Sequence, residues 1–460
     1  MAVRKTLVVC CDGTWNEPEG DGQESITNVL KFVRSLRNFD AGGNPQVTYY
    51  LEGVGTGEGW WDKYAGGGCG IGLPDKVLRA YRFLCNNFEP GDRLFLFGFS
   101  RGAYTARALA GFIGRVGLLP NRLHCELPKI YGFFHEVAPE DRERDKRRAE
   151  VERLLDSLKP EEQERGRGRV RVHMLGVWDT VGALGVPTPL LKGVTNRLLK
   201  VGFHNTELSG HIDHAYHAMA IDEHRKPYAV DLWTGALNPG QVVEQVWFAG
   251  AHSDVGGGYT DDGRLSDISF EWMMEHATRH GLAFDHSVIQ IRPEPTALLH
   301  DTYSTPYRAL GRLLPDSFEY ARRPIGGEGL NQGVHRSVVE RWMRDANYRP
   351  ESVTNYMEGL QRRSAAGEAV LGLRAGERVQ APASAMARVS VQGSEPQVVS
   401  MLDYSYRATG AARGGVRLGL NGQLLRPGQH IEVEAGEFGR QPAEVRWLDE
   451  QARQIGAAFG

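Results

Sequence analysis

Short apolar runs alternate with amphipathic patterns along the first part of the chain and recur later. They predict strands at 6–11, 47–52, 93–97, 169–178 and 242–249, and helices at 27–39 and 74–88. Such alternation is typical of a mostly parallel sheet covered by helices, the α/β class. Ligands of these sheets bind at the carboxyl ends of the strands, so polar residues there are the first candidates for chemistry.

Three later segments depart from this pattern. Residues 136–168 mix acidic and basic side chains, which predicts a solvated helical insertion broken at Pro160. Residues 185–205 include an amphipathic helix from Pro189 to Val201 with a basic flank. This helix is either a lid over the site, able to make transient contact with a membrane surface, or an ordinary surface helix. After a catalytic domain at 1–350 and a linker at 351–375, short alternating runs predict a small β-rich accessory module at 376–460.

Composition and charge exclude several classes of protein. The chain of 460 residues is 41% hydrophobic and 24% charged, as expected for a globular protein rather than a disordered one. Its formal charge of -3 gives no overall electrostatic footprint for nucleic acid. The five cysteines form no C-x-x-C pair, so neither a disulfide framework nor a zinc site is indicated. We expect no metal and no cofactor. The apolar run Leu7 to Cys11 is too short for a signal peptide, which predicts synthesis in the cytoplasm without a transmembrane segment.

The sharpest chemical signal is a G-x-S-x-G motif, Gly98-Phe99-Ser100-Arg101-Gly102. It follows the predicted strand at 93–97 and opens a predicted helix at 103–113. Glycines at both ends allow a tight turn that raises the serine hydroxyl above the sheet, and the helix N-terminus faces developing negative charge. Ser100 is therefore the candidate nucleophile.

A serine nucleophile needs a histidine base and a carboxylate that orients it. Asp179 and His252 each follow a predicted strand, in the chain order Ser, Asp, His of α/β hydrolases. Two simpler roles stay open, a loop or helix-capping carboxylate for Asp179 and a loop histidine bonded to Asp254 for His252. Asp222 is the rival acid. His217 is the rival base, although it begins a strand-like run and is expected to face the other end of the sheet.

The oxyanion of an acyl-transfer reaction needs backbone amides as donors. The amide of Arg101 is one candidate, and the amide of Gly13, in the turn after the first strand, is the other. The neighbouring Asp12 either supports this site or ties loops together.

Five ordered motifs resemble one known family. They are Cys11-Asp12-Gly13-Thr14-Trp15-Asn16, Gly53-Val54-Gly55-Thr56, the Ser100 motif, Trp178-Asp179-Thr180-Val181-Gly182, and the run from Gly250 to Tyr259. The chain resembles, over about residues 5–350, the α/β-hydrolase family that includes the type VI secretion phospholipase effectors. The resemblance implies a lipase or esterase with Ser100, Asp179 and His252 at the matching positions. It also implies a lipid or other small ester substrate, export by a type VI system, and a secretion-system or immunity partner.

Other chemistries fit less well. The glycine-rich loop from Gly53 to Gly72 contains no phosphate-binding motif, and an aspartyl phosphatase would need its nucleophile where Cys10 stands. A metal-dependent hydrolase built on Asp12, Asp179, His252 and Asp254 is the chemical alternative. A non-catalytic interaction protein on a hydrolase scaffold is the alternative from another class.

Overall fold

The computed structural model describes most of the chain through residue 356 and the strands beyond it. The described residues are 4–13, 26–53, 73–135, 142–181, 206–304, 307, 319–327, 329–356, 358 and the strands between 379 and 459. The candidate lid at 185–205 and the glycine-rich loop after Gly53 lie outside them. The chain divides into two compact units, Met1–Tyr356 and Met357–Gly460. That the first is catalytic and the second accessory stays a prediction.

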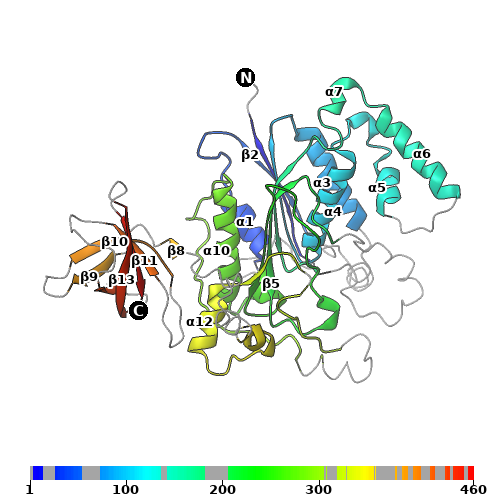
Figure 1. The fold of residues 1–460 in the computed structure, drawn as a ribbon. Helices are drawn as coiled ribbons and strands as arrows, with labels where there is room; N and C mark the ends of the chain where they lie inside the picture. The colour runs from blue at the N-terminus through cyan, green and yellow to red at the C-terminus, as the bar shows by residue number, and fades with distance from the viewer. Residues whose placement is uncertain are drawn as a thin grey trace. The chain divides into compact units, whose positions relative to one another are not determined.

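The first unit is built on a seven-stranded, fully parallel sheet (Figure 1). In spatial order its strands are β2 (Gln46–Leu51), β1 (Thr6–Cys11), β3 (Arg93–Phe99), β4 (Val172–Trp178), β5 (Ile212–Ala220), β6 (Val242–Phe248) and β7 (Gln332–Val334). The predicted α/β-hydrolase-like class, with a mostly parallel sheet, is thereby confirmed. β5 and β7 were not among the predicted strands, because polar residues interrupt β5 and β7 has only three residues.

Helices cover both faces of this sheet (Figure 1). Among the described residues, the helices of this unit include α1 (Asn28–Ser35), α3 (Leu73–Asn87), α4 (Arg101–Val116), α5 (Leu127–His135), α6 (Arg142–Asp156), α7 (Pro160–Gln163), α9 (His252–Gly256), α10 (Arg264–Arg279) and α12 (Arg336–Arg344). Short 3-10 turns lie at Asn121–Leu123 and Lys226–Tyr228. Leu7 and Val9 of β1 pack into a core with α3 and α4, and Val8 packs into a second core with α1 and α10. This double burial explains why β1 is continuously apolar.

The charged insertion consists of α6 and α7. Proline occupies the first turn of α7, where its missing N–H costs no intrahelical hydrogen bond, so Pro160 starts this helix after α6 has ended. Arg122 ties α7 to the rest of the unit through an ion pair of 2.7 Å with Glu162. No helix among the described residues has the length and apolar character needed to cross a membrane.

The second unit contains a seven-stranded sheet in the order β11-β14-β13-β12-β9-β10-β8, and its pairs are antiparallel. The strands are β8 (Val379–Gln380), β9 (Met386–Val391), β10 (Gln397–Ser405), β11 (Gly415–Gly419), β12 (His430–Ala435), β13 (Gly439–Asp449) and β14 (Gln454–Phe459). An additional pairing joins β11, the first strand of this order, to β10, the last but one.

Candidate active site

The turn between β3 and α4 holds Ser100 in a backbone conformation that non-glycine residues rarely adopt. Its φ is 58° and its ψ is -123°, and only 7% of the residue is exposed to solvent. Strain of this kind persists only where the surrounding structure enforces it, and it often marks functional sites. Ser100 therefore lies at the carboxyl end of a central strand and at the N-terminus of a 16-residue helix.

Two glycines make this turn possible by removing side-chain atoms from tight backbone contacts. A Cβ on Gly98 would lie 2.4 Å from the carbonyl oxygen of Gly102. A Cβ on Gly102 would lie 2.1 Å from the carbonyl oxygen of Cys11, at the end of β1. The outer glycines of the G-x-S-x-G motif are thus required by the close approach of α4 to β3 and β1.

Ser100, His252 and Asp179 form one continuous chain of hydrogen bonds. The Ser100 Oγ lies 2.8 Å from Nε2 of His252, and Nδ1 of His252 lies 2.6 Å from Oδ2 of Asp179. An ionised carboxylate can only accept, so Nδ1 carries the proton and Nε2 is left to accept the proton of the serine. The structure therefore brings together the three residues in the arrangement that nucleophilic catalysis by serine requires.

His252 is held at the start of α9, directly after β6 and its loop. Its ring packs against Phe99 at 4.6 Å between centroids and against Tyr228 at 5.1 Å. Its backbone amide approaches Oε2 of the buried Glu223 at 3.4 Å. These contacts limit the orientations of the imidazole, which then needs little reorganisation to serve Ser100.

Asp179 is completely buried and strongly anchored. Its φ of 38° lies in the left-handed region, its own amide donates to Ala218, and its Oδ1 accepts from the amide of Ala220 at 2.9 Å. The guanidinium of Arg323 donates to both carboxylate oxygens, at 2.6 Å to Oδ1 and 3.0 Å to Oδ2. Burial alone would raise the pKa of Asp179, but the charge of Arg323 and the bond to His252 outweigh it and hold that pKa well below its usual range.

Arg323 was not among the residues predicted from the sequence. It lies 144 residues after Asp179, beside Arg322 and Pro324, in a segment with no motif that indicates a carboxylate partner. Arg323 also donates to the carbonyl oxygens of Ala220 and Tyr228. Both terminal nitrogens of its buried guanidinium therefore have hydrogen-bond acceptors besides Asp179. It acts on Ser100 only through Asp179 and His252 and is therefore a positioning residue.

The two predicted oxyanion donors differ in their surroundings. Arg101 is the first residue of α4, so its amide lies at the N-terminal, positive end of the helix dipole. The amide of Gly13 donates to Oδ1 of Asp12 at 2.6 Å. Gly13 can serve an oxyanion only if this bond is exchanged or shared, so its role stays a prediction.

Asp12 connects three elements at the end of β1. Besides Gly13, its carboxylate accepts from Thr27 at 2.7 Å and from Tyr50 at 2.7 Å. Thr27 in turn caps α1 by accepting from the amide of Leu30. Burial raises the pKa of Asp12 to about 6, against the opposing effect of these hydrogen bonds. The contacts match the loop-tying role that the sequence analysis left open.

Asp254 and Asp222 have partners other than His252. Oδ1 of Asp254 accepts from Nδ1 of His300 at 2.6 Å, and its Oδ2 accepts from the amides of Ala251 and His300. Oδ2 of Asp222 accepts from the amide of Gly250 at 2.7 Å and from the hydroxyl of Tyr348 at 3.0 Å. Both carboxylates therefore shape the loop that carries His252, and His300 is a second residue that no sequence motif had indicated.

The expectation that His217 faces the other end of the sheet was wrong. β5 begins at Ile212, so His217 lies in the carboxyl half of the strand. Its fully buried Nε2 accepts from the amide of Thr180 at 3.1 Å, next to Asp179. Burial lowers its pKa to about 3, so the ring is neutral and engaged in a structural bond.

The carboxylates of the metal-dependent alternative do not converge. Asp12 faces Thr27 and Tyr50, Asp179 faces Arg323, and Asp254 faces His300. Among the described residues, the group of ligand atoms with metal-like spacing consists of three histidines elsewhere in the unit.

Comparisons with known proteins agree with the family resemblance. The model of the type VI secretion, Tle1-like phospholipase effector catalytic domain matches residues 5–276, which is more than half of the chain. An uncharacterized protein of Saccharomyces cerevisiae is 32% identical over 238 residues, or 48% of this chain and 31% of that protein. The chain thus spans about a third of the length of this curated relative.

Two solved structures are more distant. A protein from Pseudomonas aeruginosa, described as uncharacterized, has 16% identity and a TM-score of 0.37, covering 79% of this chain and 59% of its own. The Tle1 effector bound to the VgrG spike of the type 6 secretion system has 17% identity and a TM-score of 0.31, covering 56% of this chain and 51% of its own.

Proposed function

Because this chain belongs to the family of Tle1-like phospholipase effectors of type VI secretion, we propose that it hydrolyses acyl esters of lipids with Ser100 as nucleophile. The observation that carries the serine mechanism is the hydrogen-bonded chain from Ser100 through His252 to Asp179. The strained backbone of Ser100 at the start of α4 supports the same assignment.

In the proposed reaction, Oγ of Ser100 attacks the ester carbonyl while Nε2 of His252 takes the hydroxyl proton. Asp179 stabilises the imidazolium that forms, and it stays ionised because of Arg323. Collapse of the tetrahedral intermediate breaks the ester bond, and His252 returns the proton to the leaving alcohol. Water then attacks the acyl-enzyme with His252 again as base, which releases the fatty acid and restores Ser100.

The first amides of α4, beginning at Arg101, are the proposed donors to the oxyanion. Preorganised donors of this kind typically contribute about 3–4 kcal/mol to the stabilisation of the transition state. Gly13 would be the second donor once its amide leaves the Asp12 carboxylate.

Family membership is also the basis for a proposal about partners. We propose that the protein is exported through a type VI secretion system and is countered in its producer by an immunity partner. A strain lacking a working secretion system should then retain the protein, whereas equal release from both strains would contradict the proposal.

The mechanism is tested by Ser100→Ala combined with a fluorophosphonate probe. The wild-type chain should be labelled, and Ser100→Ala should lose both labelling and about 10⁶-fold in kcat without a change in melting temperature. Ser287→Ala, which removes an exposed hydroxyl bonded to Asp285, is the matched control and should be labelled like the wild type. Hydrolysis should be followed with a panel of phospholipids and short acyl esters.

Three outcomes would contradict the mechanism. If Ser100→Ala keeps most of the activity while Asp12→Ala abolishes it, the metal-dependent alternative replaces the serine mechanism. If neither hydrolysis nor labelling is seen in the folded wild-type chain, the protein is a non-catalytic scaffold. If soluble short esters are cleaved and no lipid is, the enzyme is an esterase with another substrate class.

A further inference from the structure

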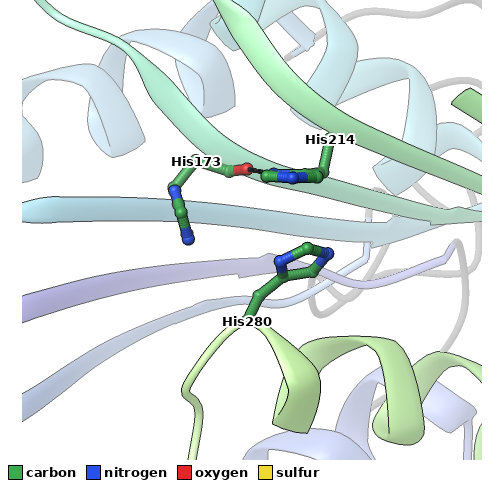
Figure 2. A group of neighbouring side chains, drawn as sticks. All are labelled: His173, His214 and His280. Atoms are coloured by element: carbon green, nitrogen blue, oxygen red, sulfur yellow. Dashed lines mark hydrogen bonds between the residues drawn. The ribbon is translucent and has the colours of Figure 1, made fainter. Parts of the chain in front are cut away.

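Three histidines from distant parts of the chain meet on the face of the sheet that α10 covers. His173 lies near the start of β4, His214 near the start of β5, and His280 directly after the last residue of α10. Figure 2 shows their rings gathered between the two strands and the end of the helix. Ring centroids are 5.4 Å apart for His173 and His214, 5.7 Å for His173 and His280, and 3.9 Å for His214 and His280.

The spacing of their nitrogen atoms suits a metal ion. One ligand atom from each ring can be chosen so that all three lie within 4.8 Å of one another. A triangle with no side longer than 4.8 Å contains a point within about 2.8 Å of every corner. Zinc binds histidine nitrogen at about 2.0–2.1 Å, so movements of about 0.7 Å per ring would complete the coordination.

Two of the rings are already oriented by hydrogen bonds through their other nitrogen. Nδ1 of His214 donates to the carbonyl oxygen of His173 at 2.9 Å, which leaves the lone pair of Nε2 for a ligand bond (Figure 2). Nε2 of His280 lies 2.9 Å from the hydroxyl of Tyr216, which leaves Nδ1. The carbonyl oxygen can only accept, so the first bond fixes the tautomer of His214. The Tyr216 hydroxyl can donate or accept, so Nδ1 of His280 offers a lone pair when Nε2 donates to that hydroxyl. Hydrogen bonds through the second ring nitrogen are typical of metal-ligating histidines.

The neighbouring charges are largely paired with one another. Arg93 donates to the carbonyl oxygen of His280 and forms an ion pair of 3.0 Å with Asp40. Asp213, whose Oδ2 lies 3.7 Å from Nδ1 of His173, is paired with Arg171. A divalent cation would therefore meet no isolated positive charge among these neighbours.

From this geometry we propose that His173, His214 and His280 bind one divalent transition-metal ion of the zinc class. Imidazole suits Zn²⁺, Co²⁺, Ni²⁺ and Cu²⁺, whereas Mg²⁺ and Ca²⁺ prefer oxygen ligands. Three protein ligands leave the fourth tetrahedral position to water.

The proposed ion stabilises the fold and takes no part in ester hydrolysis. His173 and Asp179 lie at opposite ends of β4, six residues apart, which corresponds to about 20 Å along an extended strand. The ion joins the end of α10 to β4 and β5. In the first half of α10, the hydroxyl of Ser269 donates to the carbonyl oxygen of Val255 in α9, the helix that carries His252. Binding is therefore expected to raise the melting temperature and to leave labelling of Ser100 unchanged.

Zinc titration of the chelator-treated full chain, followed by calorimetry and thermal unfolding, tests the proposal. We expect one Zn²⁺ per chain, and a melting temperature that rises by about 4 °C when free Zn²⁺ exceeds Kd a hundred-fold. Co²⁺ in place of Zn²⁺ should give the visible absorption of a tetrahedral site.

Variants separate a specific site from general binding by histidines. His214→Asn and His280→Asn should each weaken zinc binding by about 100-fold or more, and Tyr216→Phe by about 10-fold. The control His286→Asn removes an exposed histidine and should bind as the wild type does. Circular dichroism and fluorophosphonate labelling report whether each variant is folded. If the folded wild type takes up no more Zn²⁺ than folded His280→Asn, the proposal is wrong and the three rings only pack together.

Discussion

Replacing Arg323 by methionine tests how much the buried ion pair with Asp179 contributes to the stability of the catalytic unit. The guanidinium contacts both carboxylate oxygens, and the side chains of Arg323 and Asp179 are 5% and 0% exposed. Methionine approximates the length of arginine but carries no charge. The variant would leave a buried carboxylate with only His252 and the amide of Ala220 as partners.

The expected loss follows from the burial of the pair. Removing one partner of a buried ion pair costs about 3–5 kcal/mol of unfolding free energy. An unfolding entropy of about 2.1 cal/mol/K per residue, applied to the unit Met1–Tyr356, gives about 0.75 kcal/mol/K. Arg323→Met should therefore lower the melting temperature of this unit by roughly 4–7 °C.

The loss should also depend on pH, with a sign set by the lowered pKa of Asp179. In the wild type, the stabilisation is fully present above the unfolded pKa of about 3.9 and is lost as pH falls toward the lower folded value. The unfolded chains of the two proteins behave alike, so the difference between wild type and Arg323→Met should be largest at pH 7. It should shrink as pH falls and Asp179 of the variant, buried without Arg323, takes up a proton. Calorimetry or fluorescence melts across this range measure it.

Two controls make the result specific. Arg322→Met removes the neighbouring arginine, whose ion pair with Glu351 is exposed, and should change the melting temperature little. Asp179→Asn combined with Arg323→Met removes both charges and should recover part of the stability lost in Arg323→Met alone. If Arg323→Met and Arg322→Met melt within 1 °C of each other at pH 7, a difference of about 0.75 kcal/mol, the buried pair does not stabilise the unit as expected.

Two further changes address the elements around the site. Gly102→Ala would place a Cβ 2.1 Å from a backbone oxygen and should lower the unfolding free energy, measured with urea, by about 3 kcal/mol or more. In the control Gly263→Ala the nearest atom lies 3.8 Å from the new Cβ, and the loss should be less than about 1 kcal/mol. Equal losses would contradict the close approach of α4 to β1 as the reason for Gly102. Burial raises the pKa of Asp222 to about 6. The folded wild type should therefore lose stability as pH rises from about 4 to about 6, because the buried carboxyl ionises less readily than in the unfolded chain. Asp222→Asn should flatten that decline in urea unfolding, and an unchanged slope would show that other groups cause it.

The sequence alone determined much of the sheet and the turn at its centre. β1 was predicted with its observed bounds, and β3 began at the predicted residue, because strands buried on both faces are apolar throughout. The turn at Ser100 was predictable because strand, glycine-flanked serine and helix follow one another directly. The chain order and the predicted strand ends then favoured Asp179 and His252 over their rivals Asp222 and His217, although they could not give the distances between the side chains.

Only the tertiary structure decided which side chains partner the predicted residues. Arg323 reaches Asp179, and His300 reaches Asp254, across separations of 144 and 46 residues. β5 carries histidine and tyrosine side chains that local patterning treats as interruptions, yet its neighbours bury them. Hydrogen bonds between distant segments depend on how the sheet is ordered in space, and no local spacing encodes that order.

The cluster of three histidines is another feature that local sequence patterns could not predict and that the tertiary structure shows. Their separations of 41 and 66 residues match no metal-binding motif, and the sequence predicted no metal. β4 and β5 are adjacent parallel strands, so His173 and His214, each near the start of its strand, lie at the same end of the sheet. α10 packs against that sheet and ends beside them, which brings His280 into contact with both rings. Sequence patterns report which short segments form strands or helices because those preferences are local, whereas the convergence of these rings depends on strand order and helix packing.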